Sequence, residues 1–218
     1  MPGQSAPPLR LGVALFPGFQ ALDVFGPLDY LNGLSKTESL TLAVISSTLE
    51  PVSTAVSKFP NAITQSVVPT HTFAAAPPLD VLLVPGGLGT RGDSPLIEEV
   101  ITFIQDTYPK LRYLITVCTG AGLAARAGVL DGKKATTNKK AWYETVALRS
   151  QVEWVSHARW VADGNIWTSS GVSAGMDATL AWIAEVFGEK TATDIANGNE
   201  YTRQEDSSID PFADLYGL

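Results

Sequence analysis

Residues 111–128, with the sequence LRYLITVCTGAGLAARAG, have the pattern of a strand that turns abruptly into a helix. Residues 113–117 form a short, apolar and partly β-branched run, which is typical of a buried strand. Residues 121–126 are mostly good helix formers. Between them lies Cys118, the only cysteine of the chain, followed by Thr119 and Gly120. Such a turn lies at the carboxyl edge of a parallel sheet, where open α/β folds bind ligands.

Cys118 has two interpretations at this position. The positive end of the helix dipole favours thiolate over thiol, so Cys118 can be a nucleophile on a sharp elbow. The alternative is a small buried hydrophobic side chain, because free cysteine is among the most buried residue types. Position alone does not choose between the two.

The rest of the chain alternates in the same way. Short apolar runs at 11–16, 40–46 and 80–85 are typical of buried parallel strands, and amphipathic stretches at 20–33, from 94 onward and at 174–187 predict helices. Residues 158–168 predict a β-hairpin around the turn at 163–165, and residues 47–80 predict short edge strands that include 62–63 and 66–68. We therefore predict an α/β fold, with a doubly wound, mostly parallel sheet sandwiched by helices and a β-hairpin excursion. Residues 1–9 are expected to be a disordered lead, and residues 10–218 a single domain.

Composition narrows the classes of function. The formal net charge is −7, which argues against nucleic acid or an anionic membrane surface as a partner, since both require a basic footprint. A single cysteine rules out an internal disulfide framework and fits the reducing cytoplasm. The first ten residues hold three prolines and lack the apolar segment of a signal peptide. No apolar run reaches the roughly 18 residues of a membrane span.

Two further features follow strand ends. Asp23 is a carboxylate among apolar residues just beyond the first strand, and by itself it resembles an ordinary first-turn acid of a helix. Gly86 and Gly87 follow the strand at 80–85, where their N–H groups can line a carbonyl-binding loop or simply form a tight turn. The sequence GGLG at 86–89 does not match a nucleotide-binding pattern. One cysteine and two scattered histidines make no metal-ligand cluster.

Four segments together resemble the ThiJ/PfpI superfamily, which has the class I glutamine-amidotransferase-like, flavodoxin-like fold. They are LFPGFQALDVFGP (15–27), VLLVPGGLG (81–89), YLITVCTGAGLAARAGVLDGKKATT (113–137) and GNIWTSSGVSAGMDATL (164–180). The resemblance extends over residues 11–187 and is closest to the isonitrile hydratases. The motifs that carry it are Asp23, Cys118-Thr119-Gly120 and His157-Ala158-Arg159.

The resemblance implies roles for individual residues. Cys118 would be the nucleophile, and Asp23 the carboxyl group that gives and takes protons beside the thiol. The backbone N–H groups of Gly87 and Thr119 would hold an oxyanion, the Thr119 hydroxyl would orient the reacting group, and Gly86, Gly120 and Asn138 would line the site. A carboxyl beside a thiolate should have a raised pKa, because two anions share one site. The resemblance also implies a homodimer and a small electrophilic substrate.

Departures from the superfamily concern histidine. Superfamily peptidases and amidotransferases use a histidine partner, in some members directly after the cysteine, where this chain has Thr119. Many other members, and the hydratase branch, carry a histidine after the ATT strand, where this chain has Asn138. His71 and His157 match neither position. We therefore expect cysteine–aspartate chemistry rather than peptidase or amidase chemistry.

The sequence thus predicts a cofactor-independent enzyme that hydrates an isonitrile to an N-formamide. One alternative is a glutathione-independent glyoxalase, or another lyase or hydrolase of reactive carbonyl metabolites. The other is a redox-sensing or stress-protective cysteine module without catalysis.

Overall fold

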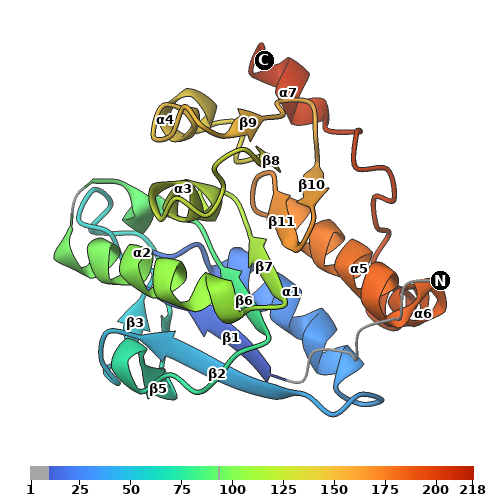
Figure 1. Ribbon diagram of the computed structural model, residues 1–218, viewed down its shortest axis with the longest axis horizontal. Coiled ribbons are helices and arrows are strands. Elements are labelled where there is room, and N and C mark those ends of the chain that lie inside the picture. The colour runs from blue at the N-terminus through green and yellow to red at the C-terminus, as the bar shows by residue number, and fades with distance from the viewer. Residues whose placement is uncertain (1–9, 93) are drawn as a thin grey trace.

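A seven-stranded sheet in the order β10-β11-β7-β6-β1-β2-β5 forms the centre of the computed structural model, which describes residues 10–92 and 94–218 (Figure 1). Its pairings are parallel except for the antiparallel pair β10–β11. The sheet strands are β1 (Arg10–Ala14), β2 (Thr41–Ser46), β5 (His71–Thr72), β6 (Val81–Val84), β7 (Tyr113–Thr116), β10 (Trp160–Asp163) and β11 (Ile166–Ser169). Two small two-stranded sheets pair β3 (Val52–Ser53) with β4 (Ser66–Val67) and β8 (Lys134–Ala135) with β9 (Glu153–Trp154).

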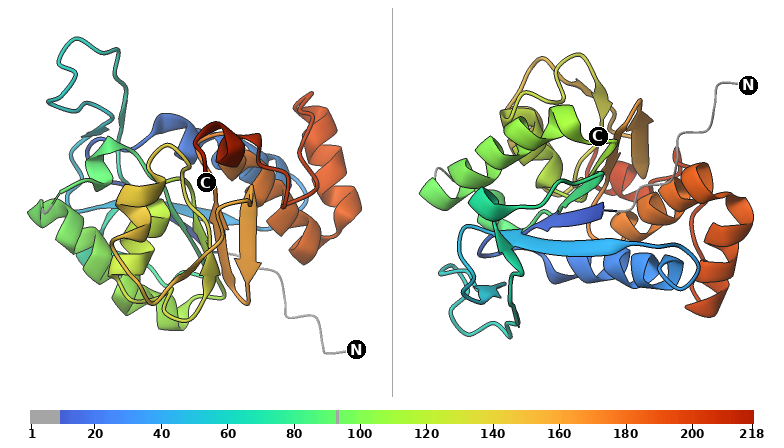
Figure 2. Two further views of the ribbon diagram at one scale, coloured as in Figure 1. Left: turned by 90° about the horizontal axis from the view of Figure 1, so that it is seen from above. Right: turned by 60° about the horizontal axis from the view of Figure 1, so that its bottom comes forward.

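Helices cover both faces of this sheet (Figures 1 and 2). Helices α1, α5 and α6 pack on one another on one face, and α2 packs beside α3 on the other. The helices are α1 (Ala21–Leu34), α2 (Pro95–Thr107), α3 (Gly120–Arg126), α4 (Trp142–Val146), α5 (Ala174–Phe187), α6 (Glu189–Gly198) and α7 (Pro211–Leu215). Three short 3-10 turns are η1 (Phe73–Ala75), η2 (Leu88–Thr90) and η3 (Tyr108–Lys110). The predicted doubly wound α/β sandwich is confirmed.

The core explains why the central strands are almost entirely apolar. All four residues of β6 are buried, and Leu82 lies between Leu114 of β7 and Gly12 of β1 in the strand register. A strand with neighbours on both sides and helices on both faces has no solvated side, so its side chains do not alternate in polarity. Helices α1 and α5 approach closely at Gly26, where an added Cβ would lie 2.7 Å from Met176 Cγ.

Three local predictions have different outcomes. The hairpin at 158–168 is confirmed as β10 and β11, and it extends the main sheet as its edge. The predicted strand at 62–63 is wrong, because those residues lie in the loop between β3 and β4, where Ile63 is 99% exposed and has no strand to pair with. The predicted disordered lead at 1–9 lies outside the described residues. None of the helices in the described ranges combines the length and apolarity that crossing a membrane requires.

Candidate active site

Cys118 occupies a strained elbow between β7 and α3. Its φ of 59° falls in the left-handed region, which costs a residue with a side chain roughly 1–3 kcal/mol. The surrounding backbone holds this conformation: Cys118 N–H donates to Ser170 O at 3.1 Å, and Thr137 Oγ1 donates to Cys118 O at 2.9 Å. Gly120 begins the helix directly behind the elbow, and a Cβ there would lie 2.3 Å from Val84 O. The elbow is therefore fixed by β6, β11 and the residues after β8 together.

The thiol sulfur lies against the side chain of Asn138. Asn138 Nδ2 donates to Cys118 Sγ at 3.1 Å, while Asn138 Oδ1 accepts from Ala141 N–H at 2.9 Å. The second bond fixes the orientation of the amide, so its N–H side faces the sulfur. Backbone N–H groups of Val172 and Thr119 also favour the charged form of the thiol. Val172 has a φ of 41°, so a second strained residue borders the sulfur.

Asp23 is completely buried beside the thiol, so it is not the solvent-facing first-turn acid that its local sequence suggests. Asp23 Oδ2 accepts from Gly86 N–H at 2.9 Å. Oδ1 has no hydrogen-bond partner of ordinary geometry within the described chain, which leaves it able to take a proton. Burial raises the pKa of Asp23 to about 7, and hydrogen bonds with Gly86 and Cys118 offset part of this increase.

The thiol itself is protonated at rest. Burial and, to a smaller extent, the Asp23 carboxylate raise the pKa of Cys118 to about 12, although the N–H donors around the sulfur lower it in part. The expectation that the helix dipole would favour the thiolate is therefore wrong for the resting protein, because Cys118 is only 5% exposed and lies beside a carboxyl group. Any reaction at the sulfur requires its proton to leave, and Asp23 is the carboxyl group beside the sulfur that can accept it.

The glycine loop after β6 packs against this elbow. An added Cβ at Gly86 would lie 2.5 Å from Thr119 N and 2.9 Å from Cys118 Cβ, so only glycine permits this approach. Gly87 N–H donates to Thr119 Oγ1 at 3.0 Å, and Thr90 Oγ1 lies 3.0 Å from the same hydroxyl. A substrate oxygen would have to displace the Thr119 hydroxyl to use the Gly87 N–H. Sequence reasoning missed Thr90, which carries no motif.

A pocket of about 240 Å³ reaches two neighbours of the thiol, although Cys118 itself is not part of its lining. Asn138, which donates to the sulfur, and Val172 are part of its wall. Phe212 and Tyr216 of α7 also line the pocket, and they belong to a tail whose sequence is mainly polar. Sequence reasoning missed these two aromatic residues, because nothing in their local pattern places them at the carboxyl edge of the sheet.

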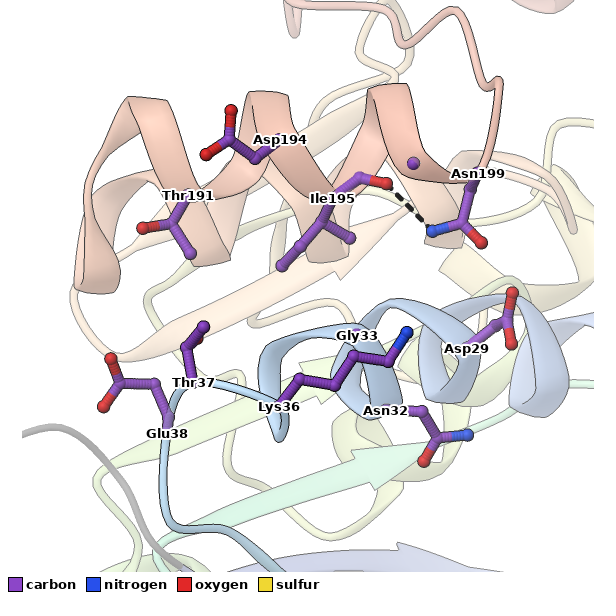
Figure 3. Close-up of a pocket in the computed structure, with 11 residues that line it drawn as sticks. Asp29, Asn32, Gly33, Lys36, Thr37, Glu38, Thr191, Asp194, Ile195 and Asn199 are labelled. Carbon is purple, nitrogen blue, oxygen red and sulfur yellow. Dashed lines mark hydrogen bonds between the residues drawn. The ribbon is translucent and has the colours of Figure 1, made fainter.

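Other parts of the molecule do not contribute to this cluster. A larger hollow of about 460 Å³ lies between α1 and α6, lined by residues such as Asp29, Lys36 and Asp194, and contains none of the candidate residues (Figure 3). His71 lies beside Thr70 and His157 contacts Asp214, and neither histidine is among the described groups that affect the Cys118 thiol. In residues 10–92 and 94–218, no three His, Cys, Asp or Glu side chains are grouped so as to hold a metal ion.

The fold and the site together define an α/β protein with a buried cysteine on a strand–helix elbow and a buried carboxyl group beside it. A family model described as the DJ-1/PfpI family matches residues 10–185, which include every element of the main sheet. The chain belongs to the DJ-1/PfpI family.

Individual relatives fall into more than one functional class. The chain is 34% identical over 186 residues to an isonitrile hydratase from Pseudomonas putida, a match that covers 84% of this chain and 75% of the relative. It is 32% identical over 130 residues to the HTH-type transcriptional regulator GbdR from Pseudomonas aeruginosa, with 59% of this chain and 34% of the regulator covered. Similarity to this domain alone therefore does not assign catalysis.

Solved structures share the fold. A ThiJ/PfpI family protein from Pseudomonas syringae superimposes with a TM-score of 0.75 and 25% identity, covering 96% of this chain and 83% of that one. DJ-1beta from Drosophila melanogaster gives a TM-score of 0.69 at 22% identity, with 89% and 98% covered.

Proposed function

We propose that this protein is a cofactor-independent cysteine enzyme that adds water to an isonitrile and releases an N-substituted formamide. The observation that carries the proposal is the pair Cys118 and Asp23. Asp23 is completely buried beside the Cys118 thiol, so the nucleophile has a carboxyl group next to it that can take and return a proton. Similarity to the Pseudomonas putida isonitrile hydratase over most of the chain supplies the substrate class.

The proposed reaction has two stages, formation of a thioimidate on Cys118 and its hydrolysis to the formamide. Asp23 takes the thiol proton while the sulfur forms a bond with the terminal isonitrile carbon, and the same proton is then delivered to that carbon. The product of this step is a thioimidate. Asp23 next takes a proton from water, whose oxygen adds to the same carbon, and the nitrogen gains that proton. Cleavage of the carbon–sulfur bond returns the second water proton to the sulfur and releases the formamide.

The structure supports particular partners for these steps. Asn138 Nδ2 and the backbone N–H groups of Val172 and Thr119 face the sulfur and stabilise negative charge as its proton leaves. Asp23 Oδ1 has no regular hydrogen bond to break before it accepts a proton. The thiol is buried and its pKa is raised, whereas an easily oxidised sensor requires an exposed thiol of low pKa, so these features argue against the redox-sensing alternative.

The test is N-formamide formation from an alkyl or aryl isonitrile, followed by mass spectrometry. Cys118→Ala and Asp23→Asn should each abolish turnover, whereas His71→Asn, a substitution far from the site on edge strand β5, should leave it intact. Retained turnover in Cys118→Ala would contradict the covalent route. Methylglyoxal is assayed in parallel, and turnover of methylglyoxal alone would favour the glyoxalase alternative.

A further inference from the structure

The segment after α6 lies beyond the part of the chain that the family model matches, which ends at residue 185. From α6 it runs along the side of β10 to α7, at the same end of the molecule as α3 and α4 (Figure 1). This segment, residues 199–218, is called the C-terminal strap below. It brings Phe212 and Tyr216 into the lining of a pocket that also includes Asn138 and Val172, the two residues whose N–H groups contact the Cys118 sulfur.

Partly buried polar contacts hold the strap against the family domain. Asp177 Oδ1 accepts from both Tyr201 OH and Gln204 N–H at 2.9 Å, and Arg159 N–H donates to Ser207 O at 2.7 Å. These contacts tie the first half of the strap to α5 and to the residue before β10. The strap therefore crosses the domain in a fixed position rather than lying loosely on its surface.

A buried ion pair fixes the second half of the strap next to the pocket. Lys139 Nζ lies 3.5 Å from Asp210 Oδ2, with both side chains at most 1% exposed. Asp210 Oδ1 also caps α7 by accepting from Phe212 N–H at 3.0 Å. Lys139 directly follows Asn138, so one short stretch of chain positions both the thiol's amide donor and the anchor of α7. The positions of Phe212 and Tyr216 are therefore coupled, through Lys139 and Asn138, to the position of the Cys118 sulfur.

We propose that the C-terminal strap is the specificity element of the site and that its pocket receives the apolar organic group of the substrate, a substituent that carries an aromatic ring. Val172, Phe212 and Tyr216 give the pocket apolar and aromatic surface, and the Lys139 amine is turned away into its buried pair with Asp210. An apolar protein cavity of about 150 Å³ binds benzene, so a pocket of about 240 Å³ accommodates a ring. The identity of the substrate rests on the proposed function, whereas the pocket can be tested without turnover.

The first measurement compares kcat/KM for benzyl isonitrile and methyl isonitrile. Wild type should prefer the benzyl compound, and Phe212→Ala and Tyr216→Ala should each lower the benzyl-to-methyl ratio by roughly tenfold, because a pocket discriminates between apolar groups by the surface it covers. Leu215→Ala is the matched control, since Leu215 lies on the same helix, is 69% exposed and is outside the pocket lining. An unchanged ratio in both aromatic variants, or an equal loss in Leu215→Ala, would overturn the proposal.

Alkylation of Cys118 tests the pocket independently of isonitrile hydration. Cys118 is the only cysteine, so its alkylation by iodoacetamide and by N-benzyl iodoacetamide can be followed by intact mass. Wild type should react faster with the benzyl reagent, and Phe212→Ala should lose most of that preference. If wild type shows no turnover of either isonitrile but is alkylated faster by the benzyl reagent, only the proposed reaction is rejected. Equal alkylation rates for the two reagents in wild type would reject the aromatic pocket itself.

Discussion

Asp23→Asn replaces a completely buried carboxyl group with an amide of nearly the same shape. The amide oxygen can still accept from Gly86 N–H, which donates to Asp23 Oδ2 at 2.9 Å in the native protein. The substitution therefore removes a charge and leaves the packing in place. This makes it a direct measure of what the buried charge costs the fold.

The expected magnitude follows from the pKa of Asp23, which burial raises from 3.8 to about 7. A shift of this size corresponds to roughly 4 kcal/mol. Between pH 3.8 and about pH 7 the folded protein keeps the Asp23 proton, whereas the unfolded chain has lost it. The free energy of unfolding therefore falls as pH rises through this range, and it is unaffected by Asp23 ionisation below pH 3.8. Relative to wild type, the free energy of unfolding of Asp23→Asn should therefore be higher by up to roughly 4 kcal/mol above neutral pH and almost unchanged near pH 3.8.

Urea unfolding of wild type and Asp23→Asn at about pH 4 and about pH 8 measures this difference. Asp29→Asn is the matched control, because Asp29 lies on the same helix and is exposed. The thiolate absorbance of Cys118 should also appear at lower pH in Asp23→Asn, since the Asp23 carboxylate raises the pKa of the thiol. An identical stability difference at both pH values, or a less stable variant at the higher one, would refute the assignment of a buried carboxyl with a raised pKa.

Two other substitutions test the elbow and the strap. Gly86→Ala should destabilise the fold by roughly 1–3 kcal/mol and abolish turnover, because the added Cβ would lie 2.5 Å from Thr119 N. Gly198→Ala is the control, since an added Cβ there would have nothing within 4 Å and should change neither stability nor turnover. Denaturant unfolding and the isonitrile assay measure both variants. Lys139→Met should cost roughly 3–5 kcal/mol, because it leaves Asp210 buried without its cation. Burial lowers the pKa of Lys139 from 10.5 to about 8, so between these pH values the unfolded chain holds a proton that the folded protein has lost. The free energy of unfolding of wild type relative to Lys139→Met should therefore increase as pH is raised from about 8 to 10.5. A pH-independent difference would contradict a buried ammonium.

Local sequence was sufficient for the fold. The apolar runs that became β1, β6 and β7 are buried on both faces, and a strand in that setting cannot be polar at alternate positions. The strand–cysteine–helix pattern at 111–128 likewise predicted an elbow, because strand and helix preferences meet there within a few residues. Where burial gives no periodic signal, as at residues 62–63 in the exposed loop between β3 and β4, the prediction failed.

The sequence by itself determined the α/β sandwich and the position of Cys118 at the edge of its sheet, since both follow from short-range preferences along the chain. Only the tertiary structure decided the state of the thiol and the shape of its pocket. The family resemblance had already placed Asp23 and Asn138 with Cys118, whereas nothing in the sequence around Phe212 points to the site. The pKa of Cys118 depends on burial and on the charge of Asp23, and these are set by packing between elements rather than by neighbours along the chain.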